Sequence, residues 1–276
     1  MEHHEGMIRT EDGIDLFYQK WYPEGSPKGI IQIVHGFAEH GSRYMNIVNA
    51  LVPKGFIVFA DDHRAHGRSG GDRGHINSFD DFISDEKELT KYIRTQEKDL
   101  PLFLLGHSMG SLISSIYLSY FPEEFSGLIL SGTGIVTGKG KLAFLILMVK
   151  IFSRILPKRK TKNTISEDIS RDPQVVEAYK NDPLVLKEFS FRFGGEMLKA
   201  SKQLPKEIVK IKLPVLIQVG EKDPIATGAK ELYSLLNSED KSLKIYDGLF
   251  HEVYNELEED RKEVLNDLEY WLMNHL

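Results

Sequence analysis

Short apolar runs recur along the chain and alternate with segments of helical periodicity. Runs that are almost continuously apolar predict strands of a mostly parallel sheet that is covered on both faces. They occupy residues 29–34, 56–60, 102–105, 128–131, 215–219 and 243–246. Residues 14–22 alternate between apolar and polar side chains instead, which predicts an early antiparallel strand.

Helical patterns lie between and after these runs. We expect Ser78 to cap a helix whose apolar residues share one face, namely Phe79, Phe82, Ile83, Leu89, Tyr92 and Ile93. The terminal segment places Val264, Leu265, Leu268, Trp271 and Leu272 at helical spacing, which fits packing against the sheet. Alternation of strands and helices over this length predicts an α/β fold, a mostly parallel doubly wound sheet with helices on both faces.

One long segment interrupts this alternation. Residues 135–208 contain no convincing strand, and the sheet pattern resumes at Pro214. An excursion of this size is better explained by an inserted helical subdomain than by a loop. We therefore expect a core formed by residues 1–134 and 209–276, with a helical cap formed by residues 135–208.

The expected cap contains an unbroken apolar run, residues 142–149. A helix from 142 to 156, ended by Pro157, is about 22 Å long and too short to span a bilayer. Basic residues follow it, namely Lys158, Arg159, Lys160 and Lys162. Two interpretations stay open, a buried helix with a solvated tail or an element that faces lipid.

Composition narrows the class of protein. Apolar residues make up 41% and charged residues 28%, as in ordinary soluble proteins, and the net charge of −6 argues against a nucleic-acid partner. The absence of cysteine excludes disulfides, thiol catalysis and cysteine-ligated zinc, and fits the cytoplasm. Residues 1–13 are polar and do not resemble a secretory signal, and we expect His3 and His4 to be solvated.

The strongest chemical signal is the sequence Gly-His-Ser-Met-Gly at residues 106–110. It follows an apolar strand and precedes a helical run, which is the context of a nucleophile elbow with Ser108 as the nucleophile. A side chain two residues before or after Ser108 is expected to collide with neighbouring backbone, so Gly106 and Gly110 are needed there. The alternative is an ordinary serine in a turn.

A serine hydroxyl needs a base, and the base needs an orienting acid. His251 follows the last predicted strand and Asp223 follows the strand before it, so both lie at the carboxyl edge where such folds place their sites. The chain order Ser, Asp, His also fits this architecture. The alternative is that Asp223 caps the next helix and His251 packs in a loop. For the oxyanion we expect two backbone N–H donors, Met109 after the nucleophile and Phe37 after the strand 29–34.

Four motifs together resemble the monoacylglycerol lipase family of α/β hydrolases, which is also described as lysophospholipase-like. They are HGFAEHGSRY at 35–44, DHRAHGRS at 62–69, GHSMG at 106–110 and YDGLFHE at 246–252. The resemblance covers the core from about residue 8 to the end and is weakest at 135–208. It implies the α/β-hydrolase fold and hydrolysis of fatty-acid monoesters of glycerol, without a cofactor, beneath a mobile cap. Ala65 stands where the family usually has glycine.

Polar residues of these motifs have two interpretations. Glu39, His40 and Arg43 either line a pocket for the glycerol head or brace the loop that carries Phe37, and bracing is favoured because polar loop residues usually hydrogen-bond locally. His107 is expected to shape the floor of the site without transferring a proton. We expect His63 and His66 to hold their turn, and we expect no metal site.

The sequence as a whole predicts a serine hydrolase that cleaves carboxylic esters of fatty acids through an acyl-enzyme. A broader carboxylesterase or lysophospholipase with the same residues is the alternative enzyme, and a non-catalytic scaffold that binds lipid is the alternative of another class. The expected partners are a lipid ester and, through the cap, a membrane surface. The expected location is the cytoplasm, with peripheral attachment to membranes as an option. Oligomeric state is left open.

Overall fold

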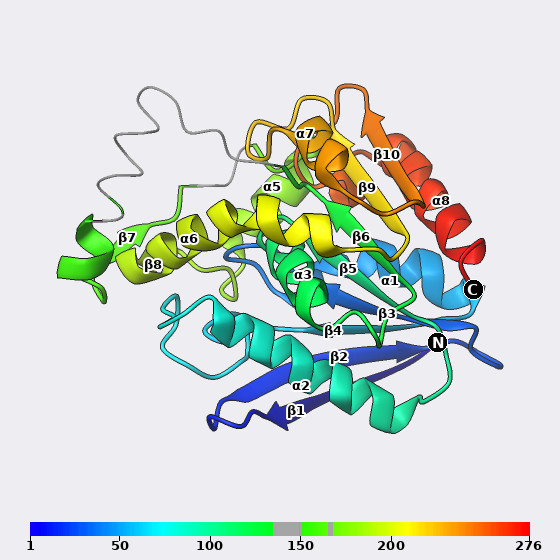
Figure 1. The fold of residues 1–276 in the computed structure, drawn as a ribbon, viewed down its shortest axis with the longest axis horizontal. Coiled ribbons are helices and arrows are strands. Elements are labelled where there is room, and N and C mark those ends of the chain that lie inside the picture. Colours follow the sequence, from blue (N-terminus) through cyan, green and yellow to red (C-terminus); the bar gives the residue numbers. More distant parts are fainter. Residues whose placement is uncertain (135–148, 150, 165–167) are drawn as a thin grey trace.

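The computed structural model describes residues 1–134, 149, 151–164 and 168–276 of the chain (Figure 1). Its centre is an eight-stranded sheet with the order β1-β2-β4-β3-β5-β6-β9-β10. The strands are β1 (Glu2–Arg9), β2 (Asp15–Tyr22), β3 (Gly29–Val34), β4 (Phe56–Asp61), β5 (Leu102–His107), β6 (Gly127–Ser131), β9 (Val215–Gly220) and β10 (Lys241–Tyr246). Strands β3 to β6, β9 and β10 pair in parallel, whereas β1 and β2 are antiparallel to their neighbours. The predicted α/β fold and the positions of its predicted strands are confirmed. The predicted burial of the last strand is wrong, because β10 lies at the edge of the sheet and only its Tyr246 is buried.

Strand β1 was not among the predicted strands. It pairs with β2 along its whole length, from Glu2 opposite Tyr22 to Arg9 opposite Asp15. The ring of His3 stacks on that of Trp21, with ring centroids 4.9 Å apart. His3 and His4 are both exposed. Backbone hydrogen bonds to β2 build this edge strand, so an apolar pattern in its own residues is not required.

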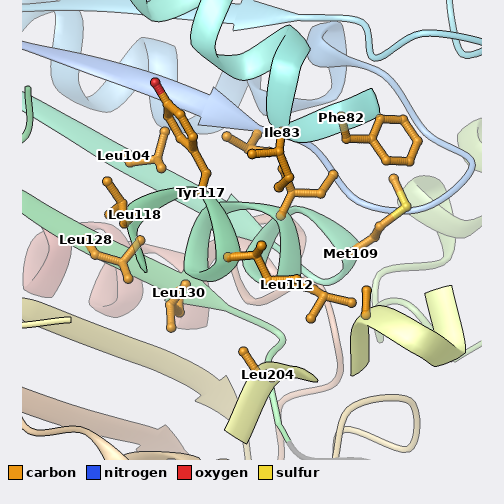
Figure 2. Close-up of a cluster of buried hydrophobic side chains, with 14 of the residues drawn as sticks. Phe82, Ile83, Leu104, Met109, Leu112, Tyr117, Leu118, Leu128, Leu130 and Leu204 are labelled. Atoms are coloured by element: carbon orange, nitrogen blue, oxygen red, sulfur yellow. The ribbon is translucent and has the colours of Figure 1, made fainter. Parts of the chain in front are cut away.

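Helices cover both faces of the sheet (Figure 1). They are α1 (Met45–Leu51), α2 (Asp80–Gln96), α3 (Met109–Tyr120), α7 (Ala229–Leu235) and α8 (Glu258–Met273), with 3-10 turns η1 (Gly41–Tyr44), η2 (Val52–Lys54), η3 (Ile208–Lys210) and η4 (Val253–Asn255). Successive residues of β5 point to opposite faces. Leu104 packs in the cluster under α2 and α3, as Figure 2 shows, whereas Leu105 packs in the cluster under α1 and α8.

The predicted apolar faces of α2 and α8 are the faces that pack inward. Phe82 and Leu268 are fully buried and belong to the two opposite core clusters. The start of α2 differs from the prediction, because the residue at its N-cap is Phe79 and not Ser78. Ser78 lies one residue earlier, where its Oγ accepts a hydrogen bond from the N–H of Asp80 at 3.3 Å.

The chain between β6 and β9 contains α5 (Pro173–Asn181), α6 (Phe191–Glu207) and two short strands, β7 (Lys160–Lys162) and β8 (Glu188–Ser190). The strands form a separate antiparallel pair, so the prediction that this segment lacks strands is wrong. The residues of β7 are polar and its partner is far along the chain, which leaves no apolar signal in the sequence. Most of the apolar run 142–149 lies outside the described residues.

The end of the predicted cap helix is described. Residues 151–155 are helical, and the helix ends before Pro157 as predicted. Ile151, Ile155 and Leu156 are 40%, 67% and 38% exposed. The basic residues that follow are not a free tail, because Lys160 contacts Asp72 and donates to the carbonyl of Arg73. In the described part of the chain no helix is long and apolar enough to cross a membrane.

Candidate active site

A single residue, Ser108, joins the end of β5 to the start of α3. Its φ of 52° and ψ of −115° lie in a region that residues other than glycine rarely adopt. A Cβ on Gly110 would lie 1.9 Å from the carbonyl oxygen of Val34, and one on Gly106 would lie 2.5 Å from that of Gly110. The predicted tight turn is present, and the two glycines are required because backbone fills the space of their side chains.

Asp223 and His251 meet at the carboxyl edge of the sheet, beyond the ends of the neighbouring strands β9 and β10. The Nδ1 atom of His251 lies 2.8 Å from Oδ2 of Asp223, and both residues are buried. The other carboxylate oxygen, Oδ1, accepts hydrogen bonds from the N–H groups of Ile225 and Ala226 at 2.8 and 2.9 Å. Asp223 therefore caps its own turn with one oxygen and orients His251 with the other.

Hydrogen bonds also set the charge of Asp223. Burial alone would raise the pKa of this carboxyl, but the hydrogen bond and charge of His251 and the two backbone N–H groups outweigh burial and lower it. Asp223 is thus a carboxylate at neutral pH, which is the form that accepts the Nδ1 proton of His251 and leaves Nε2 as a base.

Ser108 and His251 line one small cavity of about 30 Å³ together with Gly36, Phe37, Glu39, His107, Ile169, Tyr179, Ile225 and Glu252. Ile169 and Tyr179 come from the chain between β6 and β9. The remaining lining comes from the end of β5 and from the segments that follow β3, β5, β9 and β10. The site is therefore built at the sheet edge and covered by the inserted segment.

Two backbone N–H groups point to an oxyanion site. Met109 is the first residue of α3, so its N–H has no partner within the helix. The carbonyl of Gly36 accepts a hydrogen bond from Nδ1 of His35 at 2.7 Å. Because the peptide is trans, the N–H of Phe37 points to the opposite side, and among the described residues it donates to no acceptor.

Gly36 lets this loop approach Ser108. A Cβ placed on Gly36 would lie 3.3 Å from Cβ of Ser108 and 2.7 Å from Oε1 of Glu39. The ring of Phe37 packs edge-on against Phe189 and Phe193, with centroids 5.0 and 5.3 Å away. A phenyl ring carries no hydrogen-bond donor, so the donor that Phe37 offers at this site is its backbone N–H.

Glu39 and Arg43 form a buried network beside the cavity. Oε1 of Glu39 accepts from the N–H of Gly36 and from the hydroxyl of Tyr44, both at 2.7 Å. Arg43 donates to Oε2 of Glu39 at 2.7 Å and binds both oxygens of Glu252 at 2.7 and 2.8 Å. These contacts favour the bracing interpretation, because the carboxylates and the guanidinium bind the loop and each other.

The other motif histidines are buried, and each of the two described next has a polar partner at one ring nitrogen. Burial and the nearby His251 lower the pKa of His107 to about 3, so this ring is neutral and its Nδ1 lies 3.3 Å from Oγ of Ser131. Nε2 of His40 lies 2.9 Å from Oδ2 of Asp182, which links the loop after β3 to the inserted segment. Ala65 adopts a φ of +64°, which explains why glycine suits its position.

Three residues of this site were not predicted from the sequence. Glu252 directly follows His251 in the motif at 246–252, and this position was the one signal that could have found it. The Cζ atom of Arg43 lies 4.8 Å from the centroid of the Tyr179 ring, and Asp182 contacts His40. Both lie in the inserted segment, where no motif marks them.

Within the described residues, one cluster brings metal-type donors together. Asp61, His63 and Glu86 have donor atoms within 4.8 Å of one another and are fully buried. Nδ1 of His63 faces the two carboxyl groups, however, and Nε2 faces the carbonyl oxygen of His35, so both ring nitrogens are engaged by oxygen acceptors of the protein itself.

Several known proteins are similar to this chain over nearly its whole length. The model of a family described as "Serine aminopeptidase, S33" matches residues 25–258. A monoacylglycerol lipase of Mycolicibacterium smegmatis is 35% identical, covering 96% of this chain and 95% of its own, and the human monoglyceride lipase is 33% identical, covering 95% and 88%. The crystal structure of a Paleococcus ferrophilus monoacylglycerol lipase is 30% identical, with a TM-score of 0.81, over 95% of this chain and 99% of that one. The chain therefore belongs to this family of α/β hydrolases, in the branch of the monoacylglycerol lipases.

Proposed function

We propose that this protein hydrolyses monoacylglycerols to glycerol and free fatty acid, with Ser108, His251 and Asp223 as its catalytic residues. The observation that carries the proposal is the buried 2.8 Å contact between His251 and Asp223 beside a strained serine at the same sheet edge. The relatives named monoacylglycerol lipase give the substrate class. A lipid ester is therefore the ligand for which this site is built.

The proposed reaction uses these residues in fixed roles. Nε2 of His251 removes the proton of Ser108 as Oγ attacks the ester carbonyl, and the N–H groups of Phe37 and Met109 stabilise the oxyanion. The protonated imidazole then gives its proton to the leaving glycerol oxygen. Water, activated by the same ring, releases the fatty acid from Ser108. Asp223 holds the tautomer of His251 throughout.

We also propose that residues 135–208 act as a cap over a core formed by 1–134 and 209–276. Ile169 and Tyr179 line the cavity from above, and the N–H of Leu186 bonds to the carbonyl of Ala38 at 2.8 Å. A cavity of about 30 Å³ is of the order of one water molecule, so an acyl chain enters only when this cover shifts.

The exposed end of the cap is the proposed membrane contact. Ile151 and Ile155 line an open groove of about 930 Å³ against α6, where the basic residues are Arg154, Arg192, Lys199, Lys202 and Lys206. Each Lys or Arg near an anionic surface contributes about 1 kcal/mol to binding. Apolar side chains beside such charges fit a lipid surface, and with the absence of cysteine they support a cytoplasmic location with peripheral attachment.

A substrate panel tests the proposed reaction. Purified protein should hydrolyse monoacylglycerols faster than diacylglycerols, triacylglycerols or a lysophospholipid, and a short nitrophenyl ester should be cleaved as well. Preference for the lysophospholipid would favour the alternative enzyme. Absence of hydrolysis of every ester, with retained lipid binding, would favour the non-catalytic scaffold.

The membrane contact is tested with Ile155→Glu, because Ile155 is 67% exposed and its replacement should not disturb the fold. We expect weaker binding to anionic vesicles and a greater loss of activity on long-chain than on acetyl esters. Met7→Glu is the matched control, since Met7 is 57% exposed on the edge strand β1. Unchanged vesicle binding by Ile155→Glu contradicts the proposal.

A further inference from the structure

A buried cluster of titratable side chains surrounds His63, next to the loop that carries Phe37. The proposed reaction does not use this cluster. His63 follows β4 and is fully buried. Asp61 ends β4, Glu86 lies on α2, and both are also buried. The ring of His63 stacks on that of His35, with centroids 3.7 Å apart. The cluster is thus in direct contact with the residue that precedes Gly36.

Both ring nitrogens of His63 have oxygen acceptors. Nδ1 lies 3.1 Å from Oδ2 of Asp61 and 3.4 Å from Oε1 of Glu86, and Nε2 lies 3.0 Å from the carbonyl oxygen of His35. A neutral imidazole has only one N–H, so it satisfies one side and opposes the other with a lone pair. Only the doubly protonated ring satisfies both sides.

The surrounding charges agree with a protonated ring. Burial disfavours the charged form, but the charge and hydrogen bond of Asp61 outweigh burial and raise the pKa of His63 to about 9. Burial and the charge of Asp61 raise the pKa of Glu86 well above its ordinary value, which leaves Asp61 as the main counter-charge. The titratable groups facing this ring from all packed elements are Asp61, Glu86, Asp85, His35 and His66.

Two separate groups of His63 contact His35. The ring faces the carbonyl of His35, whereas the backbone N–H of His63 donates to Nε2 of His35 at 2.9 Å, so the proton of the neutral His35 ring lies on Nδ1. Burial and the charge of His63 hold the pKa of His35 well below its ordinary value, which keeps that ring neutral. Nδ1–H then donates to the carbonyl of Gly36 at 2.7 Å. This carbonyl shares its peptide plane with the N–H of Phe37.

We propose that the buried imidazolium of His63 is a positioning residue that orients the Phe37 N–H toward the oxyanion. The ring bonds the carbonyl of His35 with Nε2–H, while the backbone N–H of His63 independently fixes the tautomer of His35. The peptide between Gly36 and Phe37 is thereby fixed, with its N–H free for substrate. The inference rests on the proposed role of Phe37 in ester hydrolysis.

The protonation state is measured directly by ¹H–¹⁵N correlation spectroscopy of the histidine rings in the wild type. At pH 7.5 we expect His63 to show two ring N–H groups with imidazolium nitrogen shifts, and His35 to be neutral. His63 loses its proton as the pH rises through about 9, and kcat should fall over the same range. A neutral His63 ring at pH 7.5 overturns the proposal without any variant.

The role in catalysis is tested with His63→Gln, whose single amide cannot replace both ring contacts. We expect kcat on a short nitrophenyl ester to fall at least tenfold with KM changed less than twofold, because removing one oxyanion donor outright costs about 100- to 1,000-fold. Asp61→Asn removes the counter-charge, so its alkaline loss of kcat should begin at lower pH. A kcat of His63→Gln within twofold of the control overturns the proposal.

Glu207→Gln is the matched control. Glu207 is a buried carboxylate at the end of α6, and it accepts hydrogen bonds from Ser119 at 2.7 Å and from Lys210 at 2.6 Å, neither of which belongs to the His63 cluster or to the loop that carries Phe37. This variant also loses a buried polar contact, and we expect its kcat to equal that of the wild type. A wild type that cleaves no ester refutes the proposed function, whereas an active wild type with unaffected His63→Gln refutes this inference alone.

Discussion

Replacing Asp223 with asparagine changes one carboxylate oxygen into an NH₂ group and leaves the shape of the side chain intact. The structure decides which way the amide faces. Oδ1 accepts two hydrogen bonds, from the N–H groups of Ile225 and Ala226, whereas Oδ2 contacts only Nδ1 of His251. An asparagine keeps its oxygen toward the two donors and turns its NH₂ toward the histidine.

The opposite orientation would leave two buried N–H donors facing an NH₂ group. At about 1–3 kcal/mol for each unsatisfied donor, the penalty is about 2–6 kcal/mol, which is a preference of at least about 30-fold. Nδ1 of His251 must then accept a hydrogen bond, so its proton moves to Nε2. An imidazole with Nε2–H cannot take the proton of Ser108, and kcat should fall by about 10⁴-fold.

The assay is the steady-state hydrolysis of a short nitrophenyl ester, with thermal unfolding as a check that the variant is folded. Asp247→Asn and Glu221→Gln are the controls, because both residues lie on the same loops and are exposed. Each should retain nearly full kcat. Near-normal activity of Asp223→Asn, or a collapse in Asp247→Asn instead, would refute the assignment of Asp223 and the reasoning from its two oxygens.

Three further outcomes follow from the structure. A fluorophosphonate probe should label the wild type once, and Ser108→Ala should lose both the label and several orders of magnitude of kcat; stoichiometric labelling of this variant would show that another residue is the nucleophile. Gly110→Ala should lower the free energy of unfolding in urea by more than about 3 kcal/mol, since its Cβ would lie 1.9 Å from the carbonyl oxygen of Val34, whereas Gly70→Ala, with its nearest atoms at 3.4 Å, should be tolerated. Burial alone would raise the pKa of Asp182, but the hydrogen bond from His40 and the other contacts of this carboxylate together outweigh burial, and the net pKa is lowered. The carboxylate therefore stabilises the fold above about pH 4, and this contribution is lost as the pH falls through the lowered pKa. Asp182→Asn should therefore lower Tm by about 2–4 °C at pH 7 and have little effect at pH 3, and an equal effect at both pH values would contradict the contact.

Patterns that are local in the chain determined most of the fold in advance. Five buried strands and the inward faces of α2 and α8 follow from period and apolarity, because a side chain's direction depends on its own backbone geometry. The tight turn at Ser108 was also predictable from the sequence. Two glycines that flank a serine between an apolar strand and a helix indicate a backbone too crowded for side chains at those positions. The pairing of Asp223 with His251 was predictable because consecutive parallel strands end at one edge.

Long-range contacts were decided only in three dimensions. Strand β1 is polar and depends on β2, and β7 pairs with β8 across α5, so neither has a signal in its own residues. The choice between pocket and brace for Glu39 and Arg43 depended on Glu252, which is distant in sequence and adjacent in space. A sequence shows which groups can carry charge or donate a proton. Packing sets which partner each group meets, and therefore its protonation state and role. The physical reason is that a buried polar or charged group without a partner costs free energy.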